Sequence, residues 1–161
     1  MRKIILSLVS SAALLLVPAI GQAATKITYK STSEQQVIVL LNQIRAEHKL
    51  SPLTANTQLR NAARAHSTDM LRRGFFDHNS PSETWDTRIG RYLKASVTGE
   101  NIAWGTGSYG SADGIVKQWM NSPPHRAIIL TAGLKRVGLG LATGTFQGTP
   151  GAVMATADFA A

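Results

Sequence analysis

Apolar residues recur every three or four positions in two stretches of the first half of the chain, which is the spacing of an amphipathic helix. The stretch from Val37 to Ile44 predicts a helix over residues 34–48, with Ser33 as its N-cap. The next stretch predicts a helix over residues 56–73. Its apolar face is formed by Leu59, Ala62, Ala63, His66 and Met70.

Shorter elements are predicted along the second half of the chain. Thr84, Ser111 and Ser122 each precede a helical segment and are its expected N-cap. The predicted extended segments are residues 98–107, 136–143 and 152–159, the last two joined by a connection over residues 144–151. Helices on both faces of a small, mostly antiparallel sheet would bury all the apolar faces, so the predicted fold class is α+β.

The first 23 residues have the layout of a secretory signal peptide. Two basic residues precede an apolar stretch from Ile4 to Leu16, and small residues lead up to a cleavage site after Ala23. The alternative is an uncleaved anchor, but a transmembrane helix needs about 20 predominantly apolar residues. We therefore expect residues 1–23 to be removed and the product to be exported, to the periplasm or to the extracellular medium. No transmembrane helix is expected after cleavage.

The remaining sequence is expected to form a flexible lead-in over residues 24–32 and one domain over residues 33–161. With 43% hydrophobic residues, the chain is not intrinsically disordered. It contains no cysteine, which excludes disulfides, thiolate metal sites and a cysteine nucleophile. The formal charge of +8 gives a weak preference for anionic partners. There is no dense basic cluster and no dedicated nucleic-acid motif.

Three titratable residues stand outside the regular apolar pattern. His78 follows the second helix among aromatic residues, Glu100 lies in a segment of small and apolar residues, and His125 lies in the first turn of a helix. Two imidazoles and a carboxylate can form a metal site with positions open to water. The positive end of the helix dipole disfavours a protonated His125, which suits a metal ligand or a proton acceptor. Alternatively, both histidines only hold loops together.

Four motifs containing these residues resemble the CAP superfamily, also called the SCP or pathogenesis-related-1-like family, in its short bacterial secreted form. The motifs are Phe75-Phe76-Asp77-His78-Asn79-Ser80-Pro81, Gly99-Glu100-Asn101-Ile102-Ala103, the segment from Trp119 to Arg126, and Val137-Gly138-Leu139-Gly140. The resemblance covers nearly all of the chain after the leader. It implies an α–β–α sandwich with a cleft lined by two histidines and two acidic residues, which in several members binds a divalent metal.

Carried over motif by motif, the cleft residues are His78, Glu100 and His125. The second acidic position of the family falls on Ser122 here, and a serine hydroxyl is a poorer ligand than a carboxylate. The resemblance therefore implies weaker binding of a divalent metal such as Zn²⁺ by His78, His125 and Glu100. Many bacterial members also have Asn where this chain has Ile128.

Other polar and aromatic residues are given structural roles. Ser122 is expected to act as an N-cap, and Asn101 to fix a loop around Glu100. His66 is expected to be a buried histidine bonded to a backbone group. The expected supporting residues are Asn101, Trp104 and Trp119. Both tryptophans are expected in the core, with a position at the border of the cleft as the alternative for Trp104. Asp158 is either a surface charge or a contributor to the cleft.

The favoured function is a secreted, non-catalytic binding module. Its cleft would hold a small hydrophobic ligand such as a lipid, or else a peptide or a cell-envelope component. One alternative is a metal-assisted peptidase or nuclease, in which Glu100 acts as general base on a metal-bound water. The other is a host–microbe or envelope interaction protein that recognises its partner through the loops at residues 79–98 and 104–111.

Overall fold

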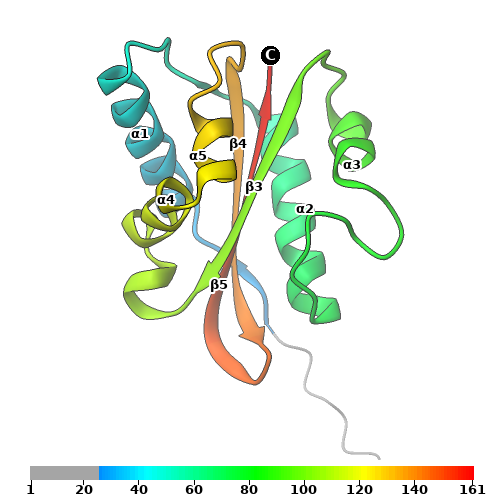
Figure 1. The fold of residues 1–161 in the computed structure, drawn as a ribbon. Coiled ribbons are helices and arrows are strands. Elements are labelled where there is room, and N and C mark those ends of the chain that lie inside the picture. The colour runs from blue at the N-terminus through cyan, green and yellow to red at the C-terminus, as the bar shows by residue number, and fades with distance from the viewer. Residues whose placement is uncertain (1–25) are drawn as a thin grey trace, which may run out of the picture.

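The computed structural model describes residues 26–161, so the predicted leader and its cleavage site lie outside the described part. Helices lie on both sides of a central sheet in Figure 1. In chain order the elements are β1 (Thr28–Tyr29), α1 (Ser31–Glu47), β2 (Thr54–Ala55), α2 (Thr57–Arg73), α3 (Trp85–Tyr92), β3 (Thr98–Gly105), the 3-10 helix η1 (Gly107–Gly110), α4 (Ala112–Asn121), α5 (Pro123–Ile129), β4 (Arg136–Phe146) and β5 (Thr149–Ala160).

The sheet has the strand order β1-β4-β5-β3, with β2 also paired to β4. All pairs are antiparallel except β2 with β4. Strand β3 therefore lies at the edge of the sheet, and its register places Glu100 beside Asp158 of β5. This arrangement confirms the predicted α–β–α sandwich.

The two faces of the sheet carry different helices. Helices α1, α4 and α5 cover one face over the larger apolar core, in which Trp119 is the largest fully buried side chain. Its indole Nε1 donates to the carbonyl of Ile102 at 3.0 Å and so joins α4 to β3. Helices α2 and α3 cover the opposite face (Figure 1). Strand β3 therefore lies where the two helical layers approach each other.

The start of α1 differs from the prediction. The helix begins at Ser31, with Lys30 as its N-cap, and Ser33 lies inside its first turn. Strand β1, which lies in the segment expected to be a lead-in, pairs with β4. The Ser31 hydroxyl also accepts a hydrogen bond from Arg64 of α2. Contacts with distant parts of the chain, rather than a local capping box, therefore determine where α1 begins.

The connection between the last two strands is much shorter than the predicted residues 144–151. Strand β4 continues to Phe146 and β5 begins at Thr149, so only Gln147 and Gly148 form the turn. Both have positive φ angles, 47° and 78°. A two-residue turn with positive φ at both positions matches the right-handed twist of a hairpin. The prediction was wrong because the glycines on either side of the turn belong to the strands.

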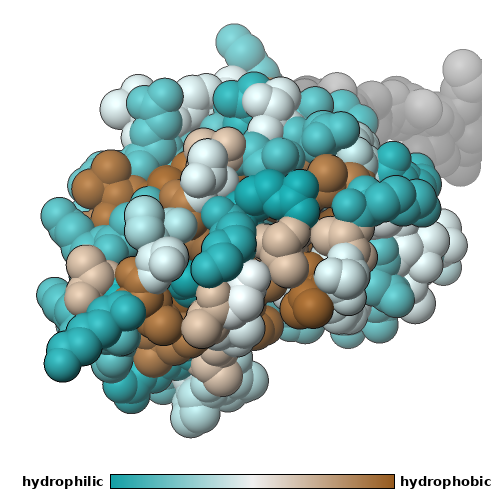
Figure 2. Space-filling view, turned by 90° about the horizontal axis from the view of Figure 1, so that it is seen from above, coloured by the Kyte–Doolittle hydropathy of each residue, from teal (hydrophilic) through white to brown (hydrophobic). Residues whose placement is uncertain are grey.

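Among residues 26–161, no helix is long and apolar enough to cross a membrane. Figure 2 shows the end of the molecule that is uppermost in Figure 1. Hydrophobic residues there form separate groups between hydrophilic ones. This face therefore offers no continuous apolar surface.

Candidate functional site

The fold brings together the three residues that the motifs single out. His78 comes from the loop between α2 and α3, Glu100 from β3, and His125 from the first turn of α5. The imidazole rings of His78 and His125 lie with their centroids 6.2 Å apart. The two histidines come from helical layers on opposite faces of the sheet and meet beside its edge strand. We call this group of residues the histidine cleft, after the cleft that the resemblance to the family implies.

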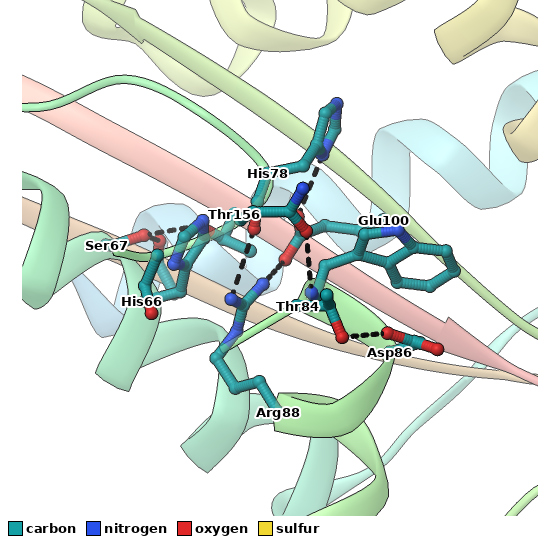
Figure 3. Close-up of polar contacts among 12 residues, drawn as sticks. His66, Ser67, His78, Thr84, Asp86, Arg88, Glu100 and Thr156 are labelled. Carbon is teal, nitrogen blue, oxygen red and sulfur yellow. Dashed lines mark hydrogen bonds and ion pairs between the residues drawn. The ribbon is translucent and has the colours of Figure 1, made fainter. Parts of the chain in front are cut away.

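The Glu100 carboxylate is buried and fully engaged. Its Oε1 accepts from Nδ1 of His78 at 2.8 Å, and its Oε2 accepts from the guanidinium of Arg88 (Figure 3). Burial raises the pKa of Glu100, but the hydrogen bond from His78 and the charge of Arg88 outweigh it and hold this pKa below its usual value. An ionised carboxylate can only accept, so Nδ1 of His78 is the donor. In the neutral tautomer of His78 that donates from Nδ1, the lone pair lies on Nε2.

Arg88 of α3 holds both partners of this contact. Besides Glu100, it donates from Nη1 to the carbonyl of His78 at 3.2 Å (Figure 3). Its side chain is only 3% exposed. Sequence reasoning placed Arg88 in a short helix without a role in the site. One sequence signal could have revealed its role. Arg88 lies between Trp85 and Ile89 on the inward face of that helix, and a buried arginine requires an acidic partner.

Asp158 lies beneath the cleft rather than on the surface. It is fully buried on β5 beside Glu100, which rules out the surface charge and leaves the other of the two alternatives, a contributor to the cleft. Burial raises the pKa of Asp158 well above its usual value, and the charge of Glu100 raises it further. These effects favour a neutral carboxyl group at Asp158 next to an ionised one at Glu100.

His66 supports the loop that carries His78. It is 1% exposed, and its Nε2 lies 2.9 Å from the carbonyl oxygen of Asp77. The expectation of a buried histidine bonded to the backbone is thereby confirmed. Burial lowers the pKa of His66, which favours the neutral ring. The neighbouring Ser67 bonds instead to the carbonyl of Gly140 and to Thr156.

His125 is positioned by two neighbours. Ser122 is the N-cap residue of α5, but its hydroxyl makes no capping bond and lies 2.8 Å from Nδ1 of His125. Asn101 donates from Nδ2 to the carbonyl of His125 at 3.0 Å. Asn101 therefore ties α5 to β3 rather than fixing a loop, because Glu100 lies within the strand. Burial, followed by the charge of His78, lowers the pKa of His125.

The two expected supporting tryptophans have different positions. Trp119 lies in the core and contacts the backbone of β3, as described above. Trp104 lies further along β3 than Glu100, and its ring packs edge-on against Phe146 with centroids 5.0 Å apart. It belongs to the small apolar cluster that also contains Met70 of α2.

The residues of the histidine cleft fit a divalent cation only in part. Among residues 26–161, no group of three His, Asp or Glu side chains could hold a metal ion. Glu100 is committed to His78 and Arg88, which leaves the two imidazoles as available ligands. Imidazole suits Zn²⁺, and a bonded Nδ1 on each ring is the usual support of a ligand that binds through Nε2. Such a site has two protein ligands and leaves the remaining positions open.

Comparison with known proteins agrees with the geometry. The model of the CAP family, described as the cysteine-rich secretory protein family, matches residues 39–159. The uncharacterized protein YkwD of Bacillus subtilis is 36% identical over 112 residues, which are 68% of this chain and 42% of that protein. The chain thus matches less than half the length of this curated relative.

Solved structures show the same fold. An extracellular protein from Bacillus anthracis that contains an SCP domain is 28% identical, with a TM-score of 0.70 over 81% of this chain and 41% of that one. An outer surface protein of Borrelia burgdorferi is 17% identical, with a TM-score of 0.74 over 84% of this chain and 96% of that one. At this lower identity, the similarity concerns the fold alone.

Proposed function

The chain belongs to the CAP family of cysteine-rich secretory proteins, and from this premise we propose that it is an exported binding module without catalytic turnover. In this proposal, Nε2 of His78 and Nε2 of His125 hold a divalent cation such as Zn²⁺. The open positions of the cation then accept an anionic or polar group of a cell-envelope ligand.

One observation carries the proposal: each cleft imidazole has its Nδ1 in a hydrogen bond. The partner is Glu100 for His78 and Ser122 for His125. The Ser122 hydroxyl can accept a hydrogen bond from Nδ1–H of His125. In that neutral tautomer the lone pair lies on Nε2, as proposed for His78. A hydrogen-bonded Nδ1 fixes the ring orientation and raises the basicity of the other nitrogen.

A cavity that shares two residues with the supports of the histidine cleft suits a polar ligand better than a lipid. Its volume is about 230 Å³, and His66 and Arg88, but not His78, Glu100 or His125, contribute to its wall. Its other lining residues are mostly polar or charged: Ala65, Asp69, Arg73, Ser80, Ser82, Glu83 and Arg91. A lipid tail would find little apolar surface there. Export rests on the predicted leader, and the SCP-domain relative from Bacillus anthracis is described as extracellular.

A hydrolase is less well supported. A general base works best with a pKa near the operating pH, whereas Glu100 is held ionised by His78 and Arg88. Ser122 and His125 form a serine–histidine contact that sequence reasoning missed. However, no third side chain orients His125 among the hydrogen bonds of residues 26–161, and its pKa is lowered. The geometry therefore supports holding a ligand better than cleaving one.

The proposal can be tested by calorimetric titration of the tag-free protein with Zn²⁺. We expect binding to be lost in His78→Ala and in His125→Ala, because each removes one of two ligands. Glu100→Gln should weaken binding by about tenfold or more through loss of the support of His78. His48→Ala is the matched control, since His48 is an exposed histidine that follows α1.

Two results would contradict the proposal. The proposed cation site is refuted if the wild-type protein binds no Zn²⁺. It is also refuted if His78→Ala and His125→Ala bind Zn²⁺ as well as the wild type does. Cation-loaded protein that hydrolyses peptides or nucleic acids, with the activity lost in His78→Ala, would overturn the non-catalytic part and favour the hydrolase.

A further inference from the structure

A second concave site lies along α4 and the preceding 3-10 helix η1. This groove has a volume of about 470 Å³, which lies within the range of ligand pockets, about 300–1,000 Å³. It is lined by Ser108, Tyr109, Ser111, Asp113, Gly114, Lys117, Gln118 and Asn121. None of these residues belongs to the histidine cleft. We call this site the α4 groove.

The α4 groove contains one aromatic side chain, and that side chain faces solvent. Tyr109 is 69% exposed, the largest value among the exposed large hydrophobic residues of the described chain. Aromatic side chains stabilise a protein mainly through the large area that they bury. Tyr109 gains little of that stabilisation in the free protein, although a bound ring system could cover it.

The backbone that carries Tyr109 is closely packed against β3 and α4. The carbonyl of Tyr109 accepts from Nε2 of Gln118 at 3.0 Å. A Cβ atom at Gly105 would lie 2.7 Å from Cβ of Tyr109, and one at Gly114 would lie 2.0 Å from the carbonyl oxygen of Ser108. Only glycine allows β3, η1 and α4 to approach so closely. An exposed ring on a closely packed backbone is pre-organised, so binding to it loses little conformational entropy.

The other side chains of the α4 groove are short hydrogen-bonding groups of mixed charge. Asp113 and Lys117 carry opposite charges, and Gln118 and Asn121 carry amides that both donate and accept. Asp113 is partly positioned by a hydrogen bond of 3.3 Å from Gln36 of α1. This set matches a ligand with many hydroxyl groups and little net charge. It does not match a protein partner, whose interface would centre on a cluster of apolar and aromatic anchors.

We propose that the α4 groove binds a glycan chain. One sugar ring stacks its C–H face on Tyr109, and its hydroxyl groups bond to the polar side chains along α4. The site goes beyond the proposed cation cleft and shares no residue with it. The two proposals are therefore tested with different probes and different variants.

The test uses NMR titration of the ¹⁵N-labelled protein with three tetrasaccharides, built from glucose, N-acetylglucosamine or galacturonic acid. These probes present neutral, amide-bearing and anionic sugars. We expect saturable shifts at Tyr109, Lys117 and Asn121 with at least one of the two uncharged sugars, and weaker shifts with the anionic one. Tyr109→Ala should weaken that binding by about tenfold, ~1.4 kcal/mol, while Tyr109→Phe should stay within about twofold because it keeps the ring. Val39→Ala, at an exposed position of α1, is the matched surface control.

Three outcomes would overturn the proposal: no shift with either of the two uncharged sugars, equal binding by Tyr109→Ala and wild type, or shifts confined to residues outside the α4 groove. Each variant is checked by its backbone spectrum. A loss of binding therefore counts only in a folded protein, and the shifts of the wild type at Tyr109, Lys117 and Asn121 keep the test valid should Tyr109→Ala unfold.

Discussion

At the scale of single residues, the site depends on a buried charge pair that no motif identified. Arg88 and Glu100 are 3% and 1% exposed, and together they fix Nδ1 and the backbone of His78. Glu100 was predicted from its motif, but as a metal ligand or base. Its partner Arg88 was not predicted to take part in the site. A sequence shows that a helix position faces inward, but it does not show which charged group lies opposite that position. The role of Glu100 as a support of His78 follows from that partner.

Replacing Arg88 with methionine should lower the free energy of unfolding by about 3–5 kcal/mol, because it leaves Glu100 buried without its partner. Urea unfolding followed by circular dichroism measures the change. The matched control is Arg91→Met, which breaks the more exposed pair with Glu83 and should cost less than about 1 kcal/mol. Equal losses in the two variants would show that burial of the Arg88 pair is unimportant.

The raised pKa of Asp158 predicts an unusual pH dependence. In the unfolded chain this group ionises near its ordinary pKa of 3.8, whereas burial and the charge of Glu100 raise its pKa in the folded protein. The contribution of this group to stability therefore falls as pH rises above about 4, by at most ~1.4 kcal/mol per pH unit. Asp158→Asn removes that loss, so its stability relative to wild type should increase as pH rises above about 4.

Thermal unfolding at several pH values tests this expectation. The control is Asp86→Asn, whose exposed carboxylate has a lowered pKa through a hydrogen bond from Thr84 and should show no such increase. A relative stability of Asp158→Asn that falls with rising pH would mean that Asp158 is ionised in the folded protein.

At the scale of elements, close packing of α2 on β4 explains the alternating glycines of the Val137-Gly138-Leu139-Gly140 motif. A Cβ atom at Gly138 would lie 2.0 Å from the backbone nitrogen of Arg60, and one at Gly140 would lie 2.3 Å from that of Arg64. The glycines face α2, while Val137 and Leu139 face the larger core. From sequence, this segment was recognised as a strand, but the reason for its glycines required the position of α2.

Gly140→Ala should therefore destabilise the protein by about 1–3 kcal/mol or more, because α2 must move away from the sheet. The change is measured by thermal unfolding against Gly133→Ala, where a Cβ atom would meet nothing within 4 Å. Failure of Gly140→Ala to fold agrees with this expectation. A stability within about 0.5 kcal/mol of wild type would show that the contact is not tight.

The helices and the sheet order illustrate what local pattern can and cannot predict. The helix over residues 56–73 was predicted closely, because Asn56 caps it through a bond to the amide of Leu59 and Gly74 ends it in a left-handed conformation. These are local signals. The short strands β1 and β2 were missed, since two residues give no periodicity and their pairing with β4 is decided by distant contacts.

At the scale of the whole molecule, the histidine cleft exists because two helical layers meet beside one edge strand. His78 and Glu100 are 22 residues apart, a spacing that by itself specifies no chelate. The family motifs named these residues, and the fold brings them close to one another. Only the folded chain shows that Arg88 holds the Glu100 carboxylate, and that Nδ1 of each imidazole has a hydrogen-bond partner.

The state of the imidazole nitrogens tests the central claim most directly. Long-range ¹H–¹⁵N NMR of the histidine rings distinguishes Nδ1 from Nε2 in each residue, before and after saturation with Zn²⁺. We expect His78 to carry its proton on Nδ1 in the free protein, and the Nε2 resonances of both His78 and His125 to shift when Zn²⁺ binds, while His48 stays unchanged. A proton on Nε2 of His78, or a Zn²⁺-induced shift at Nδ1 instead, would contradict the arrangement proposed for the histidine cleft.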